Sequence, residues 1–169
     1  MTVLYYASPT FYNKWVQDVN EYLSALPWLE NIYPIARVGV DEEGTFPEVY
    51  RNDGERKSER IFPHGNSISF FEVGGYAQIE DDFWYSVDMS VIVWADLTKA
   101  YPDKNYDYTI ELINDVVAIL EMNGAYELDI DESTPFENYS QLEKIINQNT
   151  MRPHSAFRID FTVNLLLCC

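Results

Sequence analysis

The chain has 169 residues, of which 47% are hydrophobic and 15% aromatic; this is the length of one domain and not the composition of a disordered chain. The 28 acidic residues outnumber the 11 basic ones, and the net charge of −17 disfavours sequence-independent binding of nucleic acid. No apolar run approaches the ~20 residues of a membrane span, and the first residues lack the features of a signal peptide. We therefore expect one domain (1–169), made in the cytoplasm and without membrane contact.

The first predicted element is an amphipathic helix from Phe11 to Leu26. Ser8 is a suitable N-cap, Pro9 suits the first helical position, and Pro27 ends the helix. One apolar stripe has helical spacing and comprises Phe11, Trp15, Val19, Tyr22, Leu23 and Leu26.

Residues 31–66 are predicted to form an extended segment followed by a polar excursion. In the segment from Asn31 to Val40, Pro34 favours an edge strand or an irregular entry over a central strand. Residues 41–66 contain the turn signal Asn52-Asp53-Gly54, so 46–50 and 60–62 are expected to form the two strands of a hairpin arm. The arm is either a solvated loop or a positive arm that meets the acidic face of a neighbouring subunit. The second interpretation rests on Arg51, Arg56, Lys57 and Arg60.

Two strands are predicted next, at Ser67–Val73 and Phe83–Ala95. Residues 76–79 either continue the first strand after a bulge or form a turn, and Glu80-Asp81-Asp82 separates the two strands. Alternation in the second strand assigns to the core face Phe83, Tyr85, Val87, Met89, Val91 and Val93. Other aromatic residues are expected on the opposite face or near strand ends: Phe71, Tyr76, Trp84 and Trp94. They are either protein–protein contacts or are covered by the hairpin or by a later insertion.

The C-terminal third predicts a helix at 106–122 with Gly124 as its C-terminal cap, a short strand at 126–130, and a last strand at 157–167. A short helix that begins near Ser133-Thr134-Pro135 lies within an insertion at 127–154. The fold class is therefore α+β: a mainly antiparallel sheet with two main helices packed on one face, a long β-hairpin arm and a small helical insertion before the last strand. Cys168 and Cys169 are the only cysteines, which excludes a disulfide framework.

No pattern of catalytic residues is present. His64 and His154 are far apart in sequence, and no serine or cysteine stands in a nucleophile motif. The acidic runs 41–43 and 129–132 do not match a calcium-binding loop. We expect no catalytic residue, no cofactor and no metal site, and therefore a protein that is not an enzyme.

The order of these elements resembles the tail terminator and head-to-tail connector (neck) ring proteins of tailed bacteriophages. The resemblance rests on the helix at 11–26, the hairpin at 46–62, the strands at 67–73 and 83–95, the helix at 106–122 and the final strand at 157–167. It implies a structural virion protein: a homo-oligomeric ring, sixfold or twelvefold, at the head–tail junction or upper tail. Such a ring would surround the DNA channel, let DNA pass without specific binding, and contact connector, portal or tail tube proteins.

The candidate subunit-interface residues are Arg51, Arg56, Lys57, Arg60, Phe62, Phe71, Trp84 and Trp94. The alternative interpretation of the charge is an acidic DNA mimic that inhibits a DNA-binding enzyme. A third interpretation is that the negative surface serves solubility alone.

Overall fold

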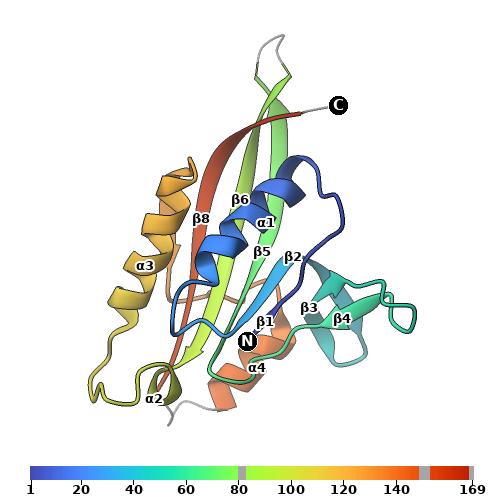
Figure 1. Ribbon diagram of the computed structural model, residues 1–169. Coiled ribbons are helices and arrows are strands. Elements are labelled where there is room, and N and C mark those ends of the chain that lie inside the picture. Colours follow the sequence, from blue (N-terminus) through green and yellow to red (C-terminus); the bar gives the residue numbers. More distant parts are fainter. Residues whose placement is uncertain (80–82, 149–152, 168–169) are drawn as a thin grey trace.

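The computed structural model describes residues 1–79, 83–148 and 153–167 (Figure 1). The predicted turn at Glu80-Asp81-Asp82 and both cysteines, Cys168 and Cys169, lie outside the described residues. In chain order the elements are β1 (Thr2–Val3), α1 (Phe11–Leu23), β2 (Asn31–Asp41), β3 (Gly44–Tyr50), β4 (Ser58–Arg60), β5 (Ser67–Gln78), β6 (Trp84–Asp96), α2 (Leu97–Ala100), α3 (Thr109–Met122), β7 (Tyr126–Asp131), α4 (Ser140–Gln148) and β8 (His154–Leu166).

The described strands form one mixed sheet with the order β4-β3-β2-β5-β6-β8-β7, and β1 pairs with β2. The β1–β2 and β2–β5 pairs are parallel, whereas the other neighbours are antiparallel. The expected α+β class with a mainly antiparallel sheet is thereby confirmed. In the described part of the chain, no helix is both long enough and apolar enough to span a bilayer.

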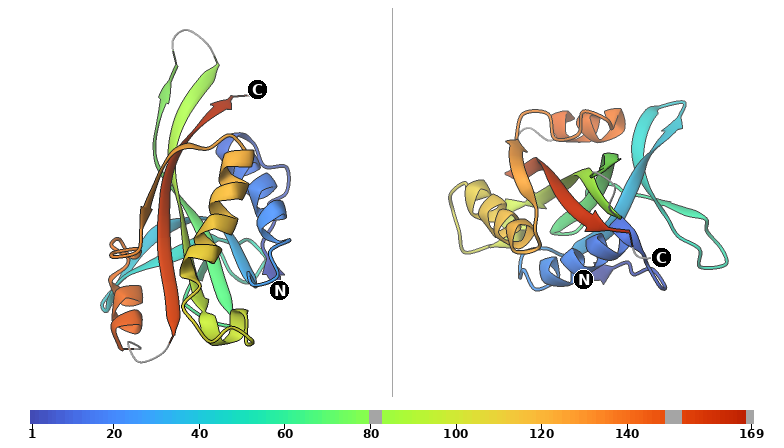
Figure 2. Two further views of the ribbon diagram at one scale, coloured as in Figure 1. Left: turned by 90° about the vertical axis from the view of Figure 1, so that its left-hand side faces the viewer. Right: turned by 90° about the horizontal axis from the view of Figure 1, so that it is seen from above.

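Helices α1 and α3 cover one face of the long strands β5, β6 and β8 (Figures 1 and 2). The core beneath them contains Val87, Met89, Val91 and Val93, as the alternation in β6 predicts. Phe83 was expected on this face but is 67% exposed, because it precedes the strand at the projecting end of the sheet. Burial therefore follows the period of two only over the stretch that the helices cover.

A second hydrophobic cluster lies on the other face of the sheet. There Phe70, Ile92 and Trp94 pack with Phe136 and Tyr139, which come from the segment before α4. Figure 2 shows α4 on the side of the sheet opposite α1 and α3. The insertion and the base of the arm therefore cover this face, and of the four aromatic residues this interpretation holds for Trp94 alone.

Helix α1 begins at Phe11, as predicted, but ends three residues before its predicted limit. Thr10, which is extended, rather than Ser8 is its N-cap; Ser8 lies further upstream in a left-handed conformation with a φ of +51°. The helix ends at Leu23 instead of Leu26, and Tyr22 is half exposed rather than part of the buried stripe.

Helix α3 also starts later than predicted, at Thr109. The carboxylate of Asp107 accepts hydrogen bonds from the Thr109 backbone N–H and hydroxyl, which fixes the start of the helix. At the other end Gly124 has a φ of +87°. Its N–H donates to Glu121 O and the Ala125 N–H donates to Leu120 O, the two bonds of a Schellman motif. The predicted glycine cap is thereby confirmed.

Pro34 lies inside β2, between strands β3 and β5 in the sheet order, so the expectation of an edge strand was wrong. The alternative, an irregular strand, is confirmed because the β2–β5 register shifts between Ile32 and Ile35. Beyond this shift β2 pairs with β3, from Ala36 to Asp41. The missing proline N–H therefore falls where β2 turns away from the main sheet toward the arm.

Candidate functional site

The predicted hairpin arm is present, although its second strand is Ser58–Arg60 rather than 60–62 because Tyr50 pairs with Ser58. The basic residues of the arm differ in how they are paired. Glu48 pairs with Arg60 and Tyr50 with Ser58 across β3 and β4. Arg51 forms ion pairs with Asp53 and Glu59 at 3.1 and 2.5 Å. Arg60 binds Asp41 at 2.6 Å and lies over the ring of Phe46. These two candidate interface residues are therefore neutralised within their own arm.

Arg56 and Lys57 lie at the exposed end of the arm, in the loop 51–57 that is called the arm tip below (Figure 1). Within the described ranges, neither side chain forms an ion pair or a hydrogen bond. Every other lysine or arginine of those ranges contacts a carboxylate or a backbone carbonyl. The arm tip contains three basic residues (Arg51, Arg56 and Lys57) and two acidic ones (Asp53 and Glu55), so its formal charge is +1 on a protein with a net charge of −17.

Two of the candidate interface aromatics are buried in the subunit, contrary to the expectation that they are surface contacts. Phe71 pairs with Val91 across β5 and β6, so both side chains point to the same face, and Phe71 is fully buried in the main core. Trp94 is 6% exposed in the second cluster, with its ring 5.2 Å from the ring of His154. Phe62 is half buried against that cluster.

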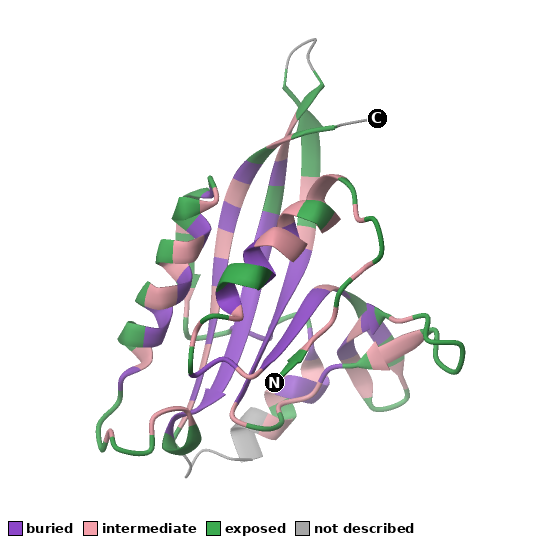
Figure 3. Cartoon of the chain, viewed as in Figure 1, coloured by how far each residue is buried: buried purple, intermediate pink, exposed green. Residues whose placement is uncertain are grey.

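Trp84 is exposed, and other exposed apolar residues lie near it at the projecting end of β5 and β6. This group, called the aromatic tip below, comprises Tyr76, Ile79, Phe83, Trp84, Leu166 and Leu167, each 37–67% exposed. Tyr76 pairs with Val87 and points to the face that α1 and α3 cover, whereas Trp84, paired with Leu166, points to the other face. Figure 3 shows this end of the sheet as exposed, in contrast to its buried middle. The rings of Tyr76 and Tyr85 contact the ring of Phe11 edge to face, so the base of the aromatic tip is held by α1.

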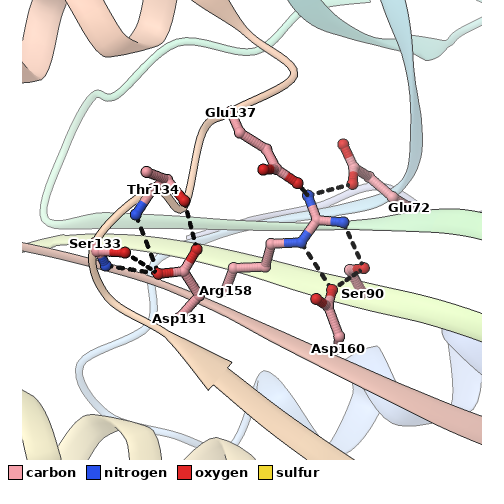
Figure 4. Close-up of polar contacts among 8 residues, drawn as sticks. All are labelled: Glu72, Ser90, Asp131, Ser133, Thr134, Glu137, Arg158 and Asp160. Atoms are coloured by element: carbon pink, nitrogen blue, oxygen red, sulfur yellow. Dashed lines mark hydrogen bonds and ion pairs between the residues drawn. The ribbon is translucent and has the colours of Figure 1, made fainter.

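A charged cluster that sequence reasoning missed lies on the second face of the sheet (Figure 4). Glu72, Ser90 and Asp160 are cross-strand neighbours on β5, β6 and β8, and Arg158 of β8 reaches across them. Its guanidinium contacts Asp160, Ser90 and Glu72 at 2.7, 2.9 and 3.0 Å. The alternation of β8 placed Arg158 and Asp160 opposite the core face, but it did not show that the insertion would half bury them.

The cluster joins the sheet to the insertion. Glu137, from the segment before α4, lies 3.9 Å from the guanidinium of Arg158. Burial works to lower the pKa of Arg158, but the hydrogen bond to Asp160 and the charge of Glu72 outweigh it and raise the pKa. Burial raises the pKa of Tyr139, and the nearby Glu72 carboxylate raises it further. Arg158 therefore stays charged and Tyr139 stays neutral at neutral pH.

A turn fixes the entry to the insertion. The Asp131 carboxylate accepts hydrogen bonds from the hydroxyls and backbone N–H groups of Thr134 and Ser133 (Figure 4), which lower its pKa. The predicted helix start at Ser133-Thr134-Pro135 was wrong because these residues form the turn that Asp131 holds, and α4 begins at Ser140. There the hydroxyl of Thr45 on β3 accepts the Ser140 N–H at 2.8 Å, which ties α4 to the arm.

A polar cleft of about 480 Å³, called the acidic cleft below, lies between the start of α3, the insertion and the start of β8. Asp107, Glu132 and Glu143 line it, together with Thr134, His154 and Ser155. No lysine or arginine is among its described lining residues. Ser155 is 3% exposed, and its hydroxyl has no hydrogen-bond partner in the described structure.

The two histidines do not come together. His64 contacts Phe62 O and the hydroxyl of Tyr33, whereas His154 lies against Trp94 on the other side of the second cluster. Among the described residues, no group of three or more His, Cys, Asp or Glu side chains could hold a metal ion. Asp41 and Asp131 instead end strands β2 and β7, and each carboxylate accepts a backbone N–H of the turn that follows.

Comparison of the chain with protein-family models, curated proteins and solved structures found no match. The candidate sites therefore rest on their geometry.

Proposed function

We propose that this protein is a structural subunit that assembles with copies of itself into a ring of the phage tail terminator or neck connector type. The aromatic tip is the observation that carries the proposal. Tyr76 is 64% exposed, Phe83 67% and Trp84 45%, and they project together beyond the core (Figure 1). Exposed apolar side chains that gather at one end of a protein are typical of interaction sites, and aromatic side chains are enriched at protein interfaces.

The charge distribution supports a role for the aromatic tip in self-association. A net charge of −17 makes copies of the chain repel one another, so contact requires a surface where like charges do not face each other. Residues 76–79, 83–86 and 163–167 contain no charged side chain, whereas Glu80-Asp81-Asp82 between the first two ranges carries three carboxylates. The uncharged ranges are the part of the projecting strands that two copies can bring together at the least electrostatic cost.

The remaining acidic surface suits the channel of such a ring. Carboxylates repel the phosphates of DNA, so DNA can move along an acidic lumen without being held. The ring would occupy the neck or upper tail of a virion, between connector, portal or tail tube proteins, and the subunit would be made in the host cytoplasm. Mass spectrometry of purified phage particles tests this location, and recovery of the chain only from particle-free lysate would contradict it.

Sedimentation velocity tests the assembly itself. The double variant F83S/W84S removes two aromatic side chains from the aromatic tip, and truncation of such residues at an interface costs roughly 1–2 kcal/mol each. We therefore expect self-association to weaken by about tenfold or more. The matched control I110S/M122S removes two exposed apolar side chains from the outer face of α3 and should associate like the wild type. A wild-type chain that stays monomeric over the whole concentration range would overturn the proposal.

The second candidate, a DNA mimic, is favoured by the net charge of −17 alone. It requires salt-sensitive binding to a basic enzyme such as a nuclease or polymerase. A pull-down that recovers such an enzyme, and no structural virion protein, would favour the mimic over the ring.

A further inference from the structure

Two features of opposite charge lie at opposite ends of the strand order. The arm tip follows β3 and precedes β4, at one end of the sheet, whereas the acidic cleft lies beside β7 and β8, at the other. Arg56 and Lys57 are exposed at the arm tip. Asp107, Glu132 and Glu143 form no ion pair within the described residues, although they line one cleft. Each feature thus lacks the counter-charge that the other supplies.

The acidic cleft is shaped for a cationic group that also donates hydrogen bonds. Its three carboxylates attract a positive charge, and the buried Ser155 hydroxyl lacks a partner in the described structure, which is costly for a buried polar group. A guanidinium carries five N–H donors and an ammonium carries three. Arginine and lysine side chains are therefore the chemistry that this cleft accepts best.

The arm tip cannot reach the acidic cleft of its own subunit. The seven residues of β3 extend away from α4, over roughly 20 Å at the usual rise per residue. In Figures 1 and 2 the arm tip projects on the side of the molecule opposite the start of α3, where Asp107 lies. The occupant of the cleft must then come from a second molecule.

We propose that the arm tip of one copy inserts Arg56 and Lys57 into the acidic cleft of the next copy. This inference rests on the proposed self-assembly and names a second contact beside the aromatic tip. The two surfaces are different parts of the chain, so the contact is head to tail. A head-to-tail contact repeats from copy to copy and closes into a ring when the rotation allows.

A neutralising double variant tests the arm tip. R56Q/K57Q should weaken self-association by about tenfold or more, because it removes both cations from a partly desolvated contact. The matched control K14Q/R37Q removes the same charge from two exposed side chains on α1 and β2 and should associate at least as well as the wild type. Circular dichroism and urea unfolding of each variant check the fold. The wild-type association should also weaken as salt rises.

Charge reversal provides the sharper experiment. R56E/K57E carries an acidic arm tip, and E132K/E143K carries a basic cleft, so each variant alone should fail to assemble. In a mixture, every arm tip again meets a cleft of opposite charge, in alternating order, and assembly should return. Restoration only in the mixture supports the pairing. Failure of the mixture to assemble, with both variants folded, overturns it.

The outcomes separate this inference from the proposed function. If the wild type assembles and R56Q/K57Q assembles equally well, the pairing fails and self-assembly stands. If the wild type never assembles, both fail. A third outcome is that a lysine-rich peptide binds the wild type but not E132K/E143K, while R56Q/K57Q leaves assembly unchanged. The occupant would then be a foreign basic segment, and the pairing between copies would be overturned.

Discussion

Replacing Arg158 by methionine tests whether the charged cluster on the second sheet face stabilises the subunit. The substitution keeps a long unbranched side chain but removes contacts at 2.7 Å to Asp160, 2.9 Å to Ser90 and 3.0 Å to Glu72. The Glu72 side chain is 12% exposed, so its charge would be left without a partner and largely without solvent. Removing one partner of a buried pair costs about 3–5 kcal/mol.

The expected loss lies at the lower end of that range. Asp160 is 49% exposed, and solvent therefore screens its share of the interaction. We expect R158M to lower the free energy of unfolding by about 3 kcal/mol. The double variant E72M/R158M replaces both buried charges by apolar side chains and should lose only about 1 kcal/mol or less. The difference between these two losses is the free energy of leaving the Glu72 carboxylate buried without a partner.

Urea unfolding at pH 7, followed by tryptophan fluorescence, measures these values, provided that the slope with urea stays constant among the variants. R37M is the matched control, since it makes the same substitution in an ion pair whose arginine is 69% exposed. It should cost less than about 1 kcal/mol. The reasoning would be refuted if R158M lay within about 0.5 kcal/mol of the wild type, or if E72M/R158M were no more stable than R158M.

Three further substitutions test other parts of the structure. Phe71→Ala should cost about 3–5 kcal/mol in urea unfolding because the ring is fully buried; a loss below about 1 kcal/mol would indicate a surface position. Gly124→Ala should raise the free energy of the folded state by about 1 kcal/mol, because φ is +87° there, and equal thermal midpoints would contradict this. Asp131 has a folded-state pKa below its unfolded value, so its stabilisation is complete above about pH 4 and is lost as the pH falls. Asp131→Asn should therefore lower the urea midpoint more at pH 7 than at about pH 2.5, and a difference independent of pH would contradict this.

The sequence by itself determined the main core and the class of the fold. Alternation identified Val87, Met89, Val91 and Val93 of β6 as one buried face, and helical spacing identified the helices that cover it. The turn signal Asn52-Asp53-Gly54 and the cap at Gly124 were also recognisable, because they depend on residues next to one another in the chain. Local signals of this kind can be recognised without knowing the tertiary contacts of the segment.

Helix limits were less predictable, because several residues can cap the same helix. Ser8 is a good N-cap by type, but its φ of +51° leaves the role to Thr10. Ser133 and Thr134 are likewise good helix starters, yet Asp131 holds them in a turn. In both places the backbone conformation decided which of several suitable residues lies at the start of the helix.

Only the tertiary structure showed which faces of the sheet are covered and which charged side chains are paired. The period of a strand divides its residues between two faces, but it does not state what covers either face. Trp94 is buried because Phe136 and Tyr139 arrive from a distant segment, and Arg158 is half buried for the same reason. The acidic cleft likewise gathers Asp107, Glu132, Glu143 and Ser155 from separate elements. Contacts between residues so far apart in sequence depend on how the whole chain folds, so the pattern of one strand or helix does not predict them.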